Sequence, residues 1–578
     1  IIESMKMEHP IAAHVAGTVT EILVAVGDTV TADQVVVRLG TAGAFAISDT
    51  PSVSTAATTE ERRDLARYRE RRRLTTDEAR PDAVAKRAAK GQRTARANIA
   101  DLVDDGSFIE YGSFAVAAQR RRRDLDDLIA NTPADGLVGG LATVGRETFG
   151  DAASRVAVAS YDYTVLAGTQ GQLNHRKKDR LFAVTEELRL PFILFAEGGG
   201  GRPGDTDAMG VAGLDCMAFA LFANLSGLVP LVGIASGYCF AGNAALLGCC
   251  DVVIATENSN IGMAGPAMIE GGGLGSVAPT DIGPIDVQSK NGVVDVRVAD
   301  EDEAVRVAKK YLSYFQGDAS GWRRHDDSDL RNLVPEQRTR VYDVRRVIDT
   351  LADRDSVLEL RAEFGVGIVT ALARIEGRPV GIIANNPAHL GGAIDSDAAD
   401  KASRFVQLCD GFEIPVVSLC DTPGFMVGPD AEKQAQVRHF GRMFVTAAST
   451  TVPWVTIVLR KGYGLGAQAM AGGSFHGNTM TVAWPTGEFG GMGLEGSVRL
   501  GYRRELDAEP TPEARAALEE KLIAAAYERG GALNMASHVE IDDVIDPADT
   551  RSRISAVIGR TPHWSARTHK KRPMIDAW

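Results

Sequence analysis

Two long stretches of the chain alternate short apolar segments, rich in β-branched residues, with glycine-rich turns and segments of helical periodicity. The first stretch runs from about residue 95 to residue 317, and the second from about residue 333 to residue 558. This alternation is typical of α/β domains, in which buried strands pack against covering helices. We therefore predict two α/β domains in tandem.

The two stretches repeat each other in spacing. A proline opens an apolar strand at Pro191 in the first stretch and at Pro415 in the second. A second strand led by proline begins 39 residues later in the first stretch and 38 residues later in the second. A turn glycine follows 51 residues after the first proline in both, at Gly242 and at Gly466. Matched spacings of this length predict an internal duplication.

The first 40 residues have a β-type pattern, with Lys6 fixed between Met5 and Met7. A lysine at the tip of a tight turn projects into water, where a modifying enzyme can reach it. A small barrel needs strands on both sides of such a turn, yet only five residues precede Lys6. We therefore expect a further N-terminal segment in the natural polypeptide.

Residues 41–94 connect these regions. Up to about residue 59 the chain is rich in Ala, Ser, Thr and Gly, which predicts a flexible linker. The following segment, to about residue 92, is rich in arginine, and such a helical run is typical of a solvated or partner-facing surface.

Composition narrows the class of protein. The 578 residues carry a formal net charge of −13, which argues against nucleic acid or an anionic membrane as the main partner. The six cysteines lack Cys-x-x-Cys spacing with histidine, so we expect reduced thiols, no structural metal and a cytoplasmic location. The sequence contains no run of about 18 apolar residues, which is the length that would predict a membrane span.

The candidate chemistry lies at glycine-bearing turns from strand to helix. The first N–H groups of a helix have no intrahelical acceptor and point outward with the positive end of the helix dipole, so they can stabilise an oxyanion. We predict one such site per domain, at Ala241 and Gly242 in the first and at Leu465 and Gly466 in the second. Two further glycines, Gly199 and Gly200, are predicted to line the first site from a neighbouring strand end.

Several motifs in order carry a family resemblance. They are residues 237–243 (GYCFAGN), 421–425 (DTPGF), 460–464 (RKGYG), 484–486 (WPT), 492–496 (MGLEG) and 546–551 (DPADTR). Over roughly residues 95–570 the chain resembles the carboxyltransferase subunit of biotin-dependent acyl-CoA carboxylases, such as the propionyl-CoA and methylcrotonyl-CoA carboxylase β-subunits. Residues 1–40 resemble the C-terminal half of a biotinyl carrier domain. Together they resemble a single-chain acyl-CoA carboxylase, including the type that accepts long-chain acyl-CoA.

The resemblance implies a fold and a set of partners. The expected fold is α/β, with two crotonase-like domains of duplicated ββα spirals at 95–320 and 333–570, preceded by part of an all-β carrier barrel at 1–40. Biotin is expected on Lys6, while ATP, Mg and bicarbonate act only through a biotin carboxylase domain, upstream or separate. We expect a homo-hexamer in lipid metabolism, with active sites at dimer interfaces.

The resemblance also implies site residues. It places the CoA phosphates at Arg176, Lys177 and Lys178, although a surface basic cluster is the plain alternative. It implies a biotin pocket at Gly424 and Phe425. It marks one further position, Gln468, as a determinant of acyl selectivity, and this polar side chain does not by itself predict a long chain.

The implied reaction transfers the carboxyl group of carboxybiotin to the α-carbon of an acyl-CoA through an enolate held by backbone N–H groups. It needs no side-chain nucleophile, because the released biotin nitrogen can accept the α-proton. Two alternatives remain open at this stage. One is a non-catalytic biotinylated carrier scaffold. The other is a crotonase-type acyl-CoA hydratase, which needs paired glutamates that Glu197 and Glu270 do not clearly supply.

Overall fold

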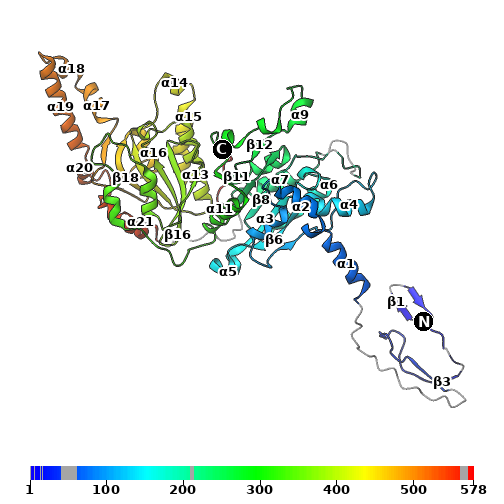
Figure 1. The fold of residues 1–578 in the computed structure, drawn as a ribbon. Helices are drawn as coiled ribbons and strands as arrows, with labels where there is room; N and C mark the ends of the chain where they lie inside the picture. Colours follow the sequence, from blue (N-terminus) through cyan, green and yellow to red (C-terminus); the bar gives the residue numbers. More distant parts are fainter. Residues whose placement is uncertain are drawn as a thin grey trace. The chain divides into compact units, whose positions relative to one another are not determined.

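The computed structural model describes residues 2–4, 7–13, 15, 17–40, 61–202, 204–207, 214–559 and 570–578. The chain divides into two compact units, unit one at Ile1–Arg67 and unit two at Tyr68–Trp578 (Figure 1). Among the described residues, no helix combines the length and the apolar character that a bilayer crossing requires.

The described residues of unit one form two antiparallel strand pairs. Strand β1 (Ile2–Ser4) pairs with β2 (Met7–His9), and Ser4 lies opposite Met7. Lys6 itself lies outside the described residues. Strand β3 (Thr18–Ile22) pairs with β4 (Val37–Gly40). These pairs agree with the β-type pattern of this segment.

The first half of unit two is built on a seven-stranded sheet. Its two antiparallel pairs lie at one edge, and the remaining pairs are parallel. In spatial order the strands are β13 (Val296–Val298), β11 (Val252–Thr256), β9 (Leu231–Ala235), β8 (Phe192–Phe195), β7 (Arg155–Tyr161), β6 (Leu137–Thr143) and β5 (Ile109–Glu110).

The second half is built on an eight-stranded sheet with the same arrangement of antiparallel and parallel pairs. Seven strands lie in the order β21 (Asp543–Val544), β19 (Met480–Ala483), β18 (Trp454–Tyr463), β17 (Val416–Thr422), β16 (Arg378–Asn385), β15 (Ile368–Ile375) and β14 (Leu358–Leu360). The eighth, β20 (Glu488–Gly490), pairs with the end of β18. The two sheets therefore share one strand order.

The paired prolines occupy equivalent positions in the two sheets. The carbonyl of Pro191 accepts the N–H of Ala157 at 2.9 Å, and the carbonyl of Pro415 accepts the N–H of Gly381 at 2.8 Å. In both halves the proline directly precedes the fourth strand from the antiparallel edge, which is β8 in the first sheet and β17 in the second. The strand and helix pattern confirms the α/β class predicted from the sequence.

Helices precede, connect and follow the strands in both halves. The principal ones in the first half are α2 (Pro81–Ala88), α3 (Ala95–Leu102), α6 (Gln172–Leu188), α7 (Ala218–Asn224), α8 (Gly242–Leu247), α9 (Pro266–Gly271) and α11 (Glu301–Ser313). Those in the second half are α12 (Val344–Leu351), α13 (Ser396–Gly411), α15 (Gln436–Ala448), α16 (Gly464–Met470), α17 (Leu494–Gly501), α19 (Pro512–Arg529), α20 (Ala532–Ser537) and α21 (Thr550–Ile558).

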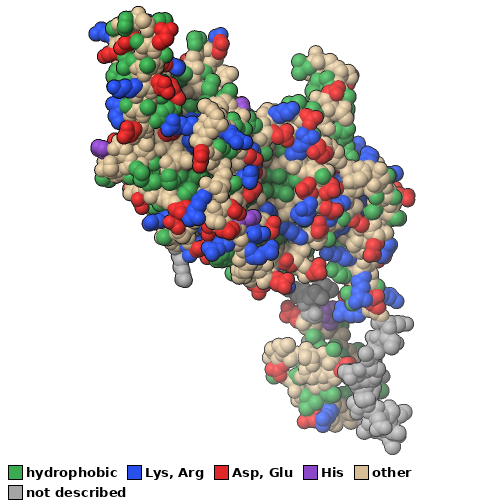
Figure 2. All heavy atoms as spheres, turned by 60° about the vertical axis from the view of Figure 1, so that its left-hand side comes forward, with side chains coloured by type: hydrophobic (Ala, Val, Ile, Leu, Met, Phe, Trp, Pro, Cys, Tyr) green, Lys and Arg blue, Asp and Glu red, His purple; other side chains and the backbone are tan. Residues whose placement is uncertain are grey.

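One large hydrophobic core joins the two halves. It contains buried side chains of both sheets, among them Val158 and Ile234 of the first and Ile383 and Val458 of the second. Figure 2 shows basic and acidic side chains interspersed over the visible face, with neither sign forming a continuous patch. The core fixes the two halves as one unit, so that loops at the strand ends of each sheet have defined positions.

Candidate functional site

The first glycine turn connects the short strand β10 (Tyr238–Phe240) to α8. Ala241 lies between them with φ +53° and ψ −124°, a conformation that strains a residue with a Cβ atom. Its N–H donates to the carbonyl of Gly262 at 3.0 Å. Because the N–H of Ala241 already has an acceptor, it is not available to a ligand. Gly242 is the first residue of α8, and the N–H groups of the first turn of a helix have no acceptor within the helix.

The predicted glycine segment packs directly against this turn. The N–H of Gly198 donates to the carbonyl of Tyr238 at 2.7 Å, and the carbonyl of Gly198 accepts from Phe240 at 2.9 Å. A Cβ atom on Gly200 would lie 2.6 Å from that of Ala241. The structure therefore brings Gly200 and the turn together, and only glycine fits this approach. Its neighbour Gly199 is exposed.

A network of buried polar side chains packs against the first glycine turn. The side chain of Asn243 donates to the carbonyls of Gly168 (3.2 Å) and Glu197 (2.9 Å), and it accepts from Gln170 Nε2 at 2.8 Å. Lys178 Nζ in turn donates to Gln170 Oε1 at 2.7 Å. Asn243, Gln170 and Lys178 form what we call the Asn243 network. Sequence reasoning missed this role, since only the burial of these polar residues in the fold reveals it.

The second glycine turn connects β18 to α16. Gly464 opens the helix with φ +58°, and Leu465 is 62% exposed. A Cβ atom on Gly466 would lie 2.7 Å from the backbone of Gly424, which has φ +121°. The predicted second oxyanion turn and the predicted Gly424 turn are thus in direct contact, and glycine is required on both sides of that contact.

Buried charged side chains hold together β17 and β18, the two strands that lead into these turns. Asp421, the next-to-last residue of β17, is fully buried and lies 3.0 Å from the guanidinium of Arg460 on β18. It also accepts the hydroxyl of Tyr342 at 2.8 Å and the N–H of Lys461 at 3.1 Å. A buried carboxylate with this many partners holds the ends of β17 and β18 in register. The sequence motifs contain Asp421 and Arg460, but only the structure identifies them as a pair.

Two other predicted residues lie beside the second turn. The ring of Phe425 stacks on that of Phe440 with centroids 3.9 Å apart. Phe425 also pairs with Ile394 in a parallel bridge, which places it against the loop before α13. Gln468 lies on α16, two residues beyond Gly466, and its side chain is exposed. This position leaves the amide group of Gln468 accessible to a ligand at the turn.

The predicted basic trio on α6 has a different orientation for each member. Lys177 is buried and its amine donates to the carbonyl of Leu137, while Lys178 belongs to the Asn243 network. Burial lowers the pKa of Lys177 to about 8 and the pKa of Lys178 to about 7. Only Arg176 is exposed. The two lysine amines therefore point into the protein rather than toward a surface phosphate.

The two glutamates that the hydratase alternative would need differ in their burial and in their partners. Glu197 is buried and receives both guanidinium N–H groups of Arg87 at 2.7 Å. Glu270 lies exposed on α9. In the described part of the chain, no cluster of His, Cys, Asp and Glu has the arrangement of a metal site.

Family models match almost the whole chain. A model of the carboxyl transferase domain matches residues 86–575, and a model of the biotin-requiring enzyme domain matches residues 1–39. The methylmalonyl-CoA carboxyltransferase 12S subunit of Propionibacterium freudenreichii subsp. shermanii is 34% identical over 492 residues, covering 82% of this chain and 90% of the relative. The long chain acyl-coenzyme A carboxylase beta4 subunit of Mycobacterium tuberculosis is 32% identical, covering 84% of this chain and 92% of the relative.

Solved structures agree with these matches. A single-chain, multi-domain long-chain acyl-CoA carboxylase is 58% identical with a TM-score of 0.82; the match covers 96% of this chain and 53% of that chain. The chain thus spans about half the length of that enzyme. The transcarboxylase 12S hexamer, solved with methylmalonyl-CoA and methylmalonic acid bound, is 30% identical with a TM-score of 0.75, covering 88% of this chain and 98% of that chain.

Proposed function

Since this chain belongs to the carboxyl transferase domain family, we propose that it transfers a carboxyl group from biotin to the α-carbon of an acyl-CoA thioester. Lys6, within the segment that matches biotin-requiring enzymes, would hold biotin covalently, and the bound group would supply the carboxyl group and a nitrogen able to accept the α-proton. The protein's own part is to orient the substrate and to stabilise negative charge.

The observation that carries this proposal is the repetition of one turn in the two halves. In each half a strand leads into a short helix through a glycine turn, and a second segment that contains glycine packs against that turn. Backbone N–H groups at such turns suit two developing oxyanions and need no acid or base side chain. A carboxyl transfer from biotin to a thioester requires two such sites, because negative charge develops on the ureido oxygen of biotin and on the thioester oxygen.

We assign the turns as follows. The N–H of Gly242 would hold the thioester oxygen as the enolate forms, with Gly199 and Gly200 lining that turn. The N–H groups of Leu465 and Gly466 would hold the ureido oxygen of biotin, with Gly424 and Phe425 forming its pocket. Ala241 orients the first turn, because its own N–H is used within the protein.

The shared strand order of the two sheets supports two tandem crotonase-like domains, at 95–320 and 333–570, after a carrier segment at 1–40 and a connection at 41–94. The hexamer assembly of the transcarboxylase 12S neighbour supports a hexamer for this chain. Active sites at its dimer interfaces are part of the same proposal. ATP, Mg and bicarbonate would act through a biotin carboxylase domain. Acyl-CoA is the proposed substrate class, and Gln468 is proposed to contact the acyl group.

The transfer can be tested in reverse without a biotin carboxylase. The purified chain is mixed with methylmalonyl-CoA labelled in its free carboxyl group and with biocytin as acceptor. We expect label to move to biocytin, and we expect acyl-CoAs of increasing length to compete. Donors labelled in the same carboxyl group and carrying longer acyl chains extend the assay, and failure of every donor to label biocytin, with the protein folded, would contradict the proposed function.

A further inference from the structure

The second glycine turn is supported differently from the first. In the first half, Asn243 directly follows Gly242 and joins that turn to the Asn243 network. The residue that follows Gly466 is Ala467, whose side chain forms no hydrogen bonds. The orientation of the second turn therefore has another source, and the residue just before the turn provides it.

Tyr463 ends β18 and directly precedes Gly464, which opens the second turn. It is buried, and its hydroxyl donates to Glu488 Oε1 at 2.8 Å. Glu488 is buried as well and begins β20, in which Gly490 lies opposite Tyr463. This hydrogen bond therefore joins the two strands at the point where the chain leaves the sheet and enters the turn.

Arg338, on the loop before α12, extends this contact. Its Nε lies 3.2 Å from Glu488 Oε2, and its guanidinium lies 3.7 Å from the ring centroid of Tyr527 on α19. The hydroxyl of Tyr527 donates in turn to Glu495 Oε1 of α17 at 2.5 Å. We call Tyr463, Glu488 and Arg338 the Tyr463 network.

The helices α17 and α19 also hold the ring of Tyr463. It packs in one hydrophobic cluster with Leu494 and Val498 of α17 and Ala526 of α19. Figure 1 shows these helices as part of an arm that extends away from the second sheet. Because the arm holds the ring and Glu488 holds the hydroxyl, the side chain of Tyr463 has a fixed orientation.

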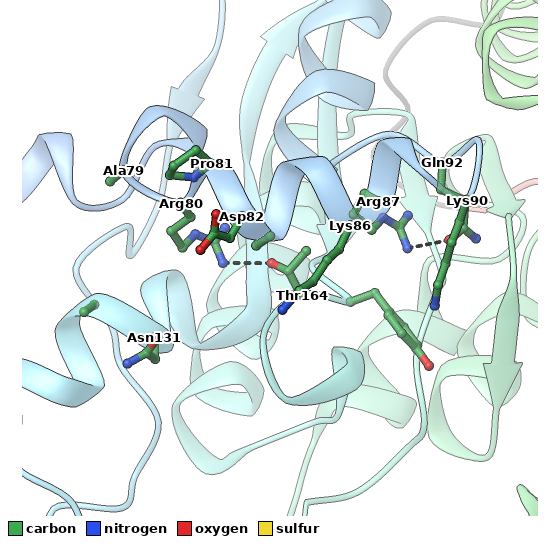
Figure 3. Close-up of a pocket in the computed structure, with 13 residues that line it drawn as sticks. Ala79, Arg80, Pro81, Asp82, Lys86, Arg87, Lys90, Gln92, Asn131 and Thr164 are labelled. Atoms are coloured by element: carbon green, nitrogen blue, oxygen red, sulfur yellow. Dashed lines mark hydrogen bonds between the residues drawn. The ribbon is translucent and has the colours of Figure 1, made fainter.

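The first half contains a related pairing of glutamate with arginine. Glu197, three residues before Gly200, receives the guanidinium of Arg87. Arg87 lies on α2, ahead of the first strand of its sheet, and it also donates to Gln92 Oε1 at 3.2 Å (Figure 3). Arg338 likewise precedes the first strand of the second sheet. In both halves an arginine from the preceding segment therefore holds a buried glutamate close to the turn.

Resting on the proposed function, we propose that Tyr463 and Glu488 are positioning residues of the carboxyl transfer. Their hydrogen bond sets the direction of the N–H groups of Leu465 and Gly466, and Arg338 keeps Glu488 in place. Neither side chain is assigned a contact with biotin, since the hydroxyl of Tyr463 is bound to Glu488. They act through the backbone, where a displacement of about 1 Å is enough to slow a reaction about a hundredfold.

Kinetics of the reverse transfer test this role. Tyr463→Phe removes the hydroxyl and keeps the ring, and we expect kcat to fall about tenfold because the donors of the turn are misplaced. The KM for methylmalonyl-CoA should stay unchanged, because the thioester is assigned to the first turn. Glu488→Ala should behave like Tyr463→Phe, whereas Glu488→Gln keeps an oxygen that can accept the hydroxyl and should retain most of the rate.

The matched control is Tyr502→Phe, which removes a hydroxyl from a tyrosine packed against the same hydrophobic cluster. Its kcat should equal that of the unaltered protein. An unchanged kcat in Tyr463→Phe, or an equal loss in Tyr502→Phe, would overturn the assignment. A rise in the KM for methylmalonyl-CoA that accompanies the fall in kcat would also overturn it, because it would indicate general loosening of the protein.

Hydrogen–deuterium exchange measures the turn without any transfer reaction. Peptides that cover α16 should exchange faster in Tyr463→Phe and in Glu488→Ala, and at the normal rate in Tyr502→Phe. Normal exchange in all three variants would show that Tyr463 does not fix the turn. This readout is independent of the proposed function, which fails when the unaltered chain labels no biocytin.

Discussion

Asn243 illustrates how a single buried amide can fix the turn to which we assign an oxyanion. Its side chain is fully buried and bonds to two backbone carbonyls and to Gln170. It is the second residue of α8, directly after Gly242. The network therefore fixes the direction in which the N–H of Gly242 points, although no network side chain is assigned to contact the substrate.

We predict that Asn243→Ala lowers kcat of the reverse transfer by about tenfold to a hundredfold, because misplacing an oxyanion donor weakens transition-state binding. The KM for acyl-CoA should change little. Stability should fall by about 1–3 kcal/mol, since Gln170 loses its buried partner. Kinetics with a thermal melt measure both effects, and Asn332→Ala, at an exposed asparagine, is the control. A normal kcat in the folded variant would remove Asn243 from this positioning role.

A second residue-scale prediction concerns acid stability. Burial, with Lys178 and Arg202 nearby, lowers the pKa of His175 to about 4. The unfolded chain binds this proton below about pH 6.5, whereas the folded protein binds it only near pH 4. The contribution of His175 to stability should therefore be complete above about pH 6.5 and be lost as the pH falls toward 4.

Melting temperatures measured between pH 7 and pH 4 test this sign. His175→Gln, which does not titrate there, should show a shallower fall than the unaltered protein. Parallel curves for the two proteins would exclude His175 as a source of the acid sensitivity.

At the scale of elements, sequence patterns predicted what depends on local backbone rules. Pro191 and Pro415 mark strand starts because proline is tolerated there, and the turn glycines mark places where two backbones approach closely. The pattern could not predict that Lys177 and Lys178 face the interior, because their depth depends on how α6 packs against β6 and β7. It likewise could not pair Asp421 with Arg460, since that contact joins neighbouring strands across the sheet.

The junction of β10 and α8 carries a prediction of its own. Ala241 has φ +53° and ψ −124°, where glycine is favoured and alanine is strained by about 1–3 kcal/mol. We expect Ala241→Gly to raise the melting temperature, because relief of strain exceeds the entropy that glycine adds to the unfolded chain, about 0.4–1 kcal/mol. Ala245→Gly, inside the same helix, should lower it. A drop in both variants would contradict the strain at Ala241.

At the scale of the whole molecule, the C-terminal residues fasten the two halves of unit two together. The backbone of Ile575 exchanges hydrogen bonds with the hydroxyl of Ser226 in the first half, at 3.3 and 3.0 Å. The neighbouring Arg572 donates to Asp410 in the second half at 2.6 Å. The side chain of Ile575 is buried in the core shared by both sheets.

We predict that Ile575→Ala destabilises unit two by about 2–5 kcal/mol, the usual cost of removing a large aliphatic side chain from a core. Met574→Ala, next to it but 57% exposed, should change stability by less than about 0.5 kcal/mol. Thermal or urea unfolding compares the two. Equal, small effects would mean that the tail adds nothing to the joint between the halves.

The central claim is that backbone N–H groups at two glycine turns, rather than side chains, support the transfer. Gly466 cannot be replaced cleanly, because a Cβ atom would collide with Gly424. Leu465 offers a better position: it is exposed, and it lies in the first turn of α16, where proline is tolerated. Leu465→Pro removes one N–H, and Leu465→Ala removes the side chain but keeps the N–H.

The decisive measurement is the reverse-transfer rate of these two variants, with melting temperature and CoA affinity as checks on folding. The account predicts that Leu465→Pro loses about 10²–10³ in kcat while Leu465→Ala stays within a few-fold of the unaltered protein. Equal rates for the two folded variants would contradict it.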